Sequence, residues 1–80
     1  MELRFTQSSR KHRIGKAHAK YVLSTSEPWI HGEVGTTRII YDWIGFDERG
    51  VELEITGILE EDYIAIIHVM PVSFRRDRKG

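Results

Sequence analysis

The sequence predicts a single α+β domain in which two amino-terminal helices pack on a twisted antiparallel sheet of three or four strands. The apolar residues recur at helical spacing before about residue 25 and follow the two-residue period of strands from residue 38 onward. A chain of 80 residues forms one domain, so residues 1–80 are assigned to it as a whole. Helices on one face of a strand meander bury both layers in the simplest way.

The two predicted helices lie in the first third of the chain. The first runs over 7–12, after Thr6, a residue type that caps helices, and Gly15 ends its pattern. The second runs over 16–24. The face that it presents to the sheet carries Ala19, Val22 and Leu23.

Two other segments frame these helices. Residues 3–5 suit a short first strand, which is the fourth strand of the predicted sheet. Residues 25–37 contain Pro28 and two glycines, so we expect an irregular connector there. Trp29 and Ile30 are expected to pack against the core from this connector.

The three strands of the predicted meander run over 38–46, 51–59 and 63–70. Their residues are β-branched or aromatic, or alternate between apolar and polar types. Gly50 suits the tight turn after the first of these strands because glycine readily takes a positive φ.

The chain beyond residue 70 is expected to leave the sheet. Pro71 has no N–H to donate to a ladder and therefore ends the third strand. Residues 72–74 are predicted to remain extended, and the basic tail over 75–80 is predicted to be flexible.

Charge is distributed unevenly along a chain whose net charge is zero. Residues 1–25 have a balance of +5, residues 26–62 a balance of −8 with ten acidic residues, and residues 63–80 a balance of +3. If the two basic ends meet in space, they form one positive surface able to hold a polyanion. A solvated surface whose charges neutralise one another is the alternative.

Composition excludes several classes of protein. The absence of cysteine excludes a disulfide scaffold, a thiolate zinc site and a cysteine nucleophile. No apolar run approaches the roughly 20 residues that span a bilayer, and the first ten residues lack the apolar region of a signal peptide. We therefore expect a cytoplasmic protein without contact to a membrane.

Metal and cofactor sites are not predicted either. His12 and His18 are six residues apart, which does not place them on one helical face. Gly32 and Gly35 lead into a strand and not into a helix, so they do not form a phosphate-binding loop. We expect no metal and no nucleotide cofactor.

Two residues near the last predicted turn suggest acid–base chemistry. His68 interrupts an apolar strand, and by alternation it shares a face with Ile64, Ile66 and Met70. Glu54 flanks the same turn at a similar distance, so the two side chains are candidate cross-strand neighbours. A carboxylate beside an imidazole can serve as a base–acid pair. A core histidine and a solvated sheet face are the structural alternatives.

Basic and aromatic residues suggest contact with nucleic acid. The segment of Arg10, Lys11, His12 and Arg13, together with Lys16, can bind phosphates from the helical side of the domain. Arg75 and Arg76 follow the last strand and extend this set. Tyr41, Trp43 and Phe74 are candidate base-stacking residues, although aromatic residues of so small a domain more often form its core.

Three stretches of the chain resemble a family of toxins. Lys11-His12-Arg13-Ile14-Gly15 resembles the Lys-His-Gly segment that joins the helices of BrnT-type toxins, with Arg13 in the usual place of the glycine. Trp43-Ile44-Gly45-Phe46-Asp47 through Leu53-Glu54, followed by Ile67-His68-Val69-Met70-Pro71, resembles a group of small actinobacterial proteins of the same kind. The resemblance extends from about Phe5 to Arg76.

The resemblance implies a RelE-like fold and a metal-independent endoribonuclease, the toxin of a bacterial toxin–antitoxin pair. In such enzymes the 2′-hydroxyl of mRNA attacks the adjacent phosphate. The residues that match the catalytic set are Glu54 as base, His68 as acid and one of Arg38, Arg75 and Arg76 on the phosphate, with Arg75 preferred. Some relatives depend on lysine and arginine, which would give Lys11 and Lys16 more weight. The implied RNA-binding residues are Lys11, His12, Arg13, Lys16, Arg38 and Arg76.

A module that binds a partner protein or nucleic acid without catalysis is the alternative function on the same fold. The two functions differ in one geometric requirement. Catalysis needs Glu54, His68 and an arginine to converge on one solvent-facing patch. Burial of His68 among Ile64, Ile66 and Met70 with no basic neighbour would count against catalysis.

Overall fold

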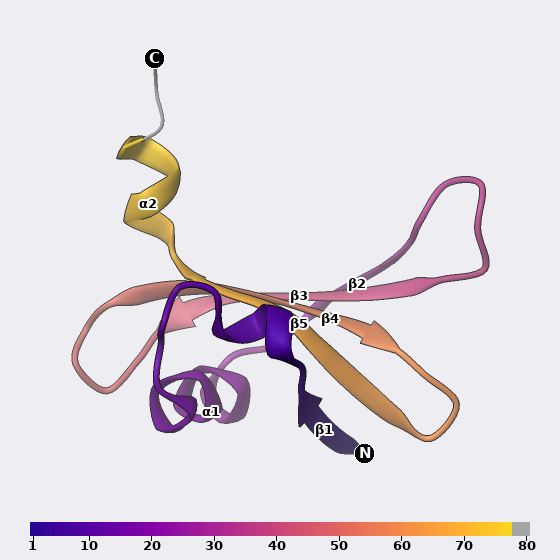
Figure 1. The fold of residues 1–80 in the computed structure, drawn as a ribbon, viewed down its shortest axis with the longest axis horizontal. Helices are drawn as coiled ribbons and strands as arrows, with labels where there is room; N and C mark the ends of the chain where they lie inside the picture. Colours follow the sequence, from indigo (N-terminus) through magenta and orange to yellow (C-terminus); the bar gives the residue numbers. More distant parts are fainter. Residues whose placement is uncertain (78–80) are drawn as a thin grey trace.

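Five strands form one mixed sheet in the computed structural model of the chain, which describes the backbone of residues 1–77 and the side chains of residues 1–75 (Figure 1). In chain order the strands are β1 (Glu2–Phe5), β2 (Trp29–Gly32), β3 (Ile39–Phe46), β4 (Glu52–Leu59) and β5 (Tyr63–Pro71). Their order across the sheet is β1-β5-β4-β3-β2. β1 runs parallel to β5, and the other neighbouring strands are antiparallel.

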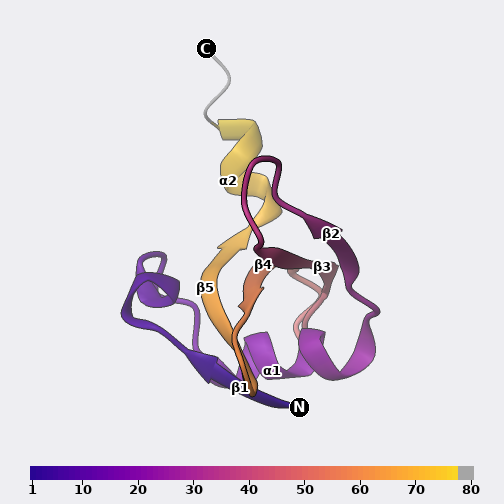
Figure 2. The ribbon, with the colours of Figure 1, turned by 90° about the vertical axis from the view of Figure 1, so that its right-hand side faces the viewer.

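Three helical segments accompany the sheet: a 3-10 turn η1 (Gln7–Arg10), the helix α1 (Lys16–Thr25) and the short helix α2 (Val72–Asp77). Helix α1 lies against one face of the sheet, whereas α2 projects from the opposite side where β5 ends (Figures 1 and 2). The face opposite α1 is called the open face below. Within residues 1–77, no helix is both long and apolar enough to cross a membrane.

The predicted fold of two amino-terminal helices on an antiparallel, RelE-like sheet was therefore wrong. The first predicted helix is only the single turn η1, where side chains bind one backbone carbonyl of the segment itself and one of β5. The hydroxyl of Ser9 donates to the carbonyl of Thr6 at 2.5 Å, and the hydroxyl of Thr6 donates to the carbonyl of Ile66 at 2.9 Å. The parallel pairing of β1 with β5 makes the sheet mixed.

Two further segments differ from their predictions. Residues 29–32 form β2 at the edge of the sheet, where the prediction was an irregular connector. Trp29 pairs with Asp42 on the open face and is 75% exposed, so it does not pack against the core. Residues 72–77 form α2, so the predictions of an extended segment over 72–74 and of a flexible tail from residue 75 were wrong for these residues. The rest of the predicted tail, 78–80, lies outside the described residues.

The elements with the strongest periodicity were predicted to within one residue at each end. They are α1 and the three strands β3, β4 and β5. Gly50 has a φ of 81° in the turn between β3 and β4, as predicted.

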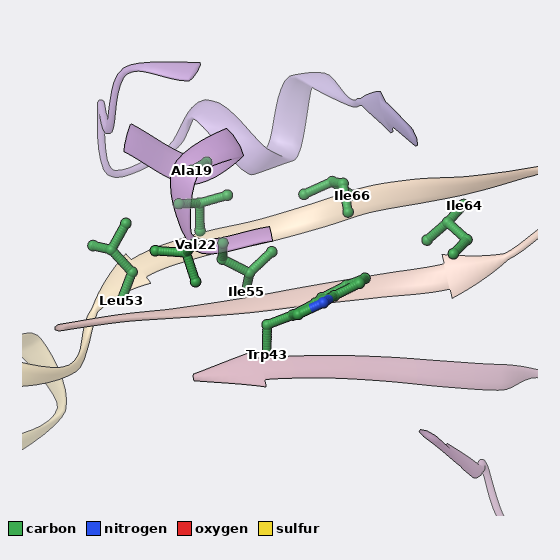
Figure 3. Packing of buried hydrophobic residues seen from close by; sticks show 8 residues of the cluster. Ala19, Val22, Trp43, Leu53, Ile55, Ile64 and Ile66 are labelled. Carbon is green, nitrogen blue, oxygen red and sulfur yellow. The ribbon is translucent and has the colours of Figure 1, made fainter. Parts of the chain in front are cut away.

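The core lies between α1 and the sheet (Figure 3). Val22 of α1 packs in the same cluster as Leu53 and Ile55 of β4 and Ile66 of β5, and all four side chains are completely buried. Burial of each such side chain contributes roughly 1.5–3 kcal/mol to folding. The helix is thus held on this face, and the open face is left for other contacts.

A β-bulge in β5 determines which side chains reach each face. Gly57 pairs with Ile66 and the preceding Thr56 pairs with His68, so Ile67 is an extra residue between them. The bulge reverses the alternation, so that Ile66 faces α1 and His68 faces the open side. The prediction that His68 shares a face with Ile64 and Ile66 was therefore wrong, although it does share one with Met70.

The segment after β1 satisfies the carbonyl groups of the bulge. The backbone N–H and the hydroxyl of Thr6 both donate to the carbonyl of Ile66, at 3.0 and 2.9 Å. The hydroxyl of Ser8 donates to the carbonyl of Ile67 at 3.1 Å. These bonds satisfy both carbonyls from the β1 side of the strand.

Gly57 leaves room for the core at the bulge. A Cβ atom at this position would lie 2.6 Å from Cγ2 of Ile64 and 3.2 Å from Cδ1 of Ile66. We predict that Gly57→Ala lowers the free energy of unfolding by about 1–3 kcal/mol, because the core must shift to admit the methyl group. Urea denaturation followed by circular dichroism measures this loss.

Gly32→Ala is the matched control, because a Cβ atom in that strand would meet its nearest neighbour, the carbonyl oxygen of Arg38, only at 3.9 Å. Equal stability of the two variants would contradict the tight packing around Gly57.

Asp47 organises the turn between β3 and β4. Its side chain is buried and accepts hydrogen bonds from the backbone N–H groups of Arg49 and Val51, at 2.8 and 3.0 Å. It also accepts from Nε and Nη2 of Arg49, at 3.0 and 2.7 Å. Burial raises the pKa of Asp47, but these hydrogen bonds lower it more, and the net pKa lies below its ordinary value of 3.8.

This lowered pKa predicts an acid-sensitive contribution to stability. The contribution of Asp47 is fully present above pH 3.8 and is lost as the pH falls through the lower pKa of the folded state. The difference in unfolding free energy between the native chain and Asp47→Asn should therefore be largest near neutral pH and shrink in acid. Urea denaturation across about pH 2–7 tests this, with Glu61→Gln in the exposed turn 60–62 as control. A difference that stays constant with pH would contradict it.

Candidate active site

Glu54, His68 and Arg75 meet on the open face, as the sequence predicted for a catalytic set. Nε2 of His68 lies 2.9 Å from Oε2 of Glu54. Nη2 of Arg75 donates to Oε1 of the same carboxylate. Each oxygen of Glu54 therefore holds one partner, an imidazole on one side and a guanidinium on the other.

Three different elements supply these side chains. Glu54 pairs with Met70 and His68 pairs with Thr56, so Glu54 and His68 are diagonal neighbours on adjacent strands. Pro71 is the last residue of β5, and α2 follows it directly. One turn of this helix brings Arg75 back to Glu54 of β4.

The three residues line a pocket of about 610 Å³. Lys11 and His12, from the loop before α1, form another part of its wall together with Phe74. The His12 ring makes edge contacts with His68 and Phe74, at centroid distances of 5.9 and 5.6 Å. The pocket is thus bounded by the sheet, by α2 and by the loop between η1 and α1.

The basic ends of the chain meet at this pocket. Lys11 comes from the amino-terminal basic segment and Arg75 from the carboxy-terminal one, and both line the same cavity. Glu54, which comes from the acidic middle segment of the sequence, lines the same cavity as these two cations. The charge pattern of the sequence therefore becomes a mixed surface with two cations around one carboxylate.

Exposure differs strongly within the set. The side chains of Glu54, His68 and Arg75 are 16%, 32% and 62% exposed. A carboxylate as buried as Glu54 needs the partners it has. Moving the exposed Arg75 away from Glu54 costs little free energy, because surface ion pairs contribute only about 0–1 kcal/mol. The arrangement can accept a proton, donate a proton and bind an anion.

The other residues predicted to bind RNA divide into two groups. Lys11 and His12 line the pocket. Lys16 lies over the ring of Phe5, with Nζ 5.7 Å from its centroid, and Arg38 lies 3.9 Å from the carboxylate of Glu33 near the β2–β3 connection. Neither residue lines the pocket.

Two predicted residues have no described side-chain contact with the pocket. Arg13 is exposed and takes a φ of 58° in the turn that follows His12. The side chain of Arg76 lies outside the described part of the chain. Of the three aromatic candidates, Phe74 lines the pocket, whereas Trp43 is buried and Tyr41 stacks on it at 5.8 Å.

Sequence reasoning missed a row of side chains beside this set. Trp29, Asp42, Thr56 and His68 are consecutive register partners across β2, β3, β4 and β5. The hydroxyl of Thr56 donates to Oδ1 of Asp42 at 2.8 Å, and Nε2 of His31 lies 2.7 Å from Oδ2. The alternation within β4 places Thr56 beside Glu54, but the row required β2, which was not predicted.

A second group has ligating atoms close enough to hold a cation. His18, Asp47 and Glu48 place theirs within 4.8 Å of one another. The sequence spacing was used to compare His18 only with His12, so it did not predict that the turn at 47–48 packs near α1. Oδ2 of Asp47 already accepts two hydrogen bonds from Arg49, and a cation would have to displace them. His18, Asp47 and Glu48 therefore act as a hydrogen-bonded group that stabilises the turn.

No family model, no curated protein and no solved structure matches this chain.

Proposed function

We propose that the chain is a metal-independent endoribonuclease that cleaves RNA by attack of the 2′-hydroxyl on the adjacent phosphate. The observation that carries the proposal is the contact of Glu54 with both His68 and Arg75 on the open face. Lys11 and His12 at the rim of the same pocket favour a polyanionic substrate.

The proposed reaction uses a base, an acid and an anion-binding group. Glu54 takes the proton of the 2′-hydroxyl while the 2′-oxygen forms its bond to phosphorus. The bond from phosphorus to the 5′-oxygen breaks, and the imidazolium of His68 gives that oxygen its proton. The products are a 2′,3′-cyclic phosphate and a 5′-hydroxyl. The RNA loses one proton from its 2′-hydroxyl to Glu54 and receives one proton on its 5′-oxygen from His68.

Arg75 is the arginine that fits the phosphate. It already lies beside the proposed base, whereas Arg38 lies near Glu33 outside the pocket. An incoming phosphate would compete with Glu54 for the guanidinium, which offers paired donors suited to phosphate oxygens. This exchange would free one oxygen of Glu54 to accept the proton of the 2′-hydroxyl.

The short motifs that resemble BrnT-type toxins contribute to the same pocket, although the RelE-like fold that the resemblance implied was wrong. Their residues Lys11, His12, Glu54 and His68 all line the pocket. Arg13, which stands in the place of the glycine, has a positive φ, the conformation that glycine adopts most easily. We therefore extend the proposal to the toxin of a bacterial toxin–antitoxin pair.

An antitoxin is the proposed protein partner, and exposed apolar residues indicate where it would bind. Ile44 and Phe46 are exposed on the open face. Ile44 is the register partner of Glu54, so a chain that covered Ile44 would also cover the proposed base. The same surface fits a binding module without catalysis, which makes cleavage the deciding test.

Three variants test the catalytic set. Glu54→Gln, His68→Gln and Arg75→Ala should each lower the rate of RNA cleavage about 100- to 10,000-fold, since each removes a proton-transfer or phosphate-binding group. Cleavage of a labelled RNA in the presence of a chelator measures the rate, and mass spectrometry identifies the cyclic phosphate. Arg38→Ala is the matched control and should retain most of the activity.

Growth after induction of the gene alone tests the role as a toxin. The native chain should arrest growth, and a folded and equally abundant His68→Gln variant should not. Equal cleavage by the native chain and all three variants would refute the catalytic assignment. Soluble native protein that neither cleaves RNA nor arrests growth would favour the binding module.

A further inference from the structure

A second pocket adjoins the proposed catalytic pocket on the open face. It encloses about 210 Å³ and shares Glu54 and Arg75 with the larger pocket. The rest of its wall includes Trp29 of β2, Asp42 and Ile44 of β3 and Thr56 of β4. A ligand that enters one pocket can therefore reach into the other past the same two side chains.

The two pockets differ in the charged groups that they do not share. Glu54 and Arg75 line both pockets, and the larger one adds Lys11 and His12, which suit a phosphate. The smaller one has two carboxylates, Asp42 and Glu54, and Arg75 is its only cationic side chain among the described residues. A phosphate is repelled by two carboxylates, whereas a flat group with hydrogen-bond donors is attracted. The pair of pockets thus matches the two ends of a nucleotide.

Asp42 is held in a fixed orientation for such a ligand. Thr56 binds its Oδ1 and His31 contacts its Oδ2, at 2.8 and 2.7 Å. A carboxylate has about four lone-pair sites, so each oxygen keeps one acceptor site after these contacts. Asp42 consequently keeps an acceptor site on each of its two oxygens and has no donor.

Trp29 provides a stacking surface beside this carboxylate. It is the register partner of Asp42, lines the pocket and is 75% exposed. So large an exposed aromatic side chain next to a polar pocket is the arrangement on which single-stranded bases stack. The contact of Trp29 with the ring of His31, at 6.3 Å between centroids, holds the indole beside the row.

We propose that this second pocket binds a guanine base of the RNA substrate, an inference that rests on the proposed ribonuclease function for its choice of ligand. Guanine presents two adjacent N–H donors on its Watson–Crick edge, which match the two free acceptors of Asp42. Adenine, cytosine and uracil each place an acceptor beside a donor on that edge, so one of their atoms repels the carboxylate.

Binding of the four nucleoside 3′-monophosphates tests the proposal without any cleavage, because these ligands lack the scissile bond. Isothermal titration should show 3′-GMP binding about tenfold more tightly than the other three. Asp42→Asn should abolish this preference, since an amide offers one donor and one acceptor. Trp29→Ala should weaken binding of all four nucleotides by about 5- to 100-fold.

Ile30→Ala is the matched control, because Ile30 neighbours Trp29 and is exposed but does not line the pocket. Equal affinity of the native chain for the four nucleotides would overturn the proposal, and this comparison needs no variant to fold. Preference for 3′-GMP that survives in folded Asp42→Asn would also overturn it. RNA cleavage without a preference for guanine would support the ribonuclease function and refute the guanine pocket. Guanine binding without cleavage would support the guanine pocket and refute the ribonuclease function.

Discussion

The extra residue at Ile67 determines on which side of the sheet His68 lies. Without it, strict alternation would turn His68 toward α1, together with Ile66. The bulge instead allows Ile64 and Ile66 to fill the core and then turns the imidazole to the open face, opposite Thr56 and diagonal to Glu54. Bulges commonly redirect side chains beside active sites, and here the proposed catalytic pocket depends on the redirected imidazole.

Maintaining the bulge requires residues far away in the sequence. Thr6 and Ser8 bind the carbonyls of Ile66 and Ile67, and Gly57 leaves the space into which Ile64 and Ile66 pack. The short segment after β1 thus supplies hydrogen bonds to β5, a strand near the other end of the sequence. The loop that follows it carries Lys11 and His12 to the same pocket. The amino-terminal segment thus supplies both the hydrogen bonds to the bulge and two residues of the proposed site.

The periodicity of the sequence predicted the elements whose structure depends mainly on residues close together in the chain. Helix α1 and strands β3, β4 and β5 have clear periods, and counting outward from the turn at 60–62 placed Glu54 beside His68. The short strand β1 was predicted, but its parallel pairing with β5 was not, and β2, α2 and the bulge were missed. Trp29 and Asp42 became neighbours only through β2, and the position of Arg75 came from α2. The catalytic and RNA-binding roles of these residues remain predictions.

The direction in which His68 points is the central claim, and nuclear Overhauser contacts of its ring protons in the native chain test it most directly. We predict contacts from His68 to the ring of His12 and to the neighbouring Met70, with Val69 contacting Ile55 on the other face as an internal reference. Contacts from the His68 ring to Ile55 or Val22 would place it in the core. That result would contradict the bulge and, with it, the proposed catalytic pocket that His68 lines.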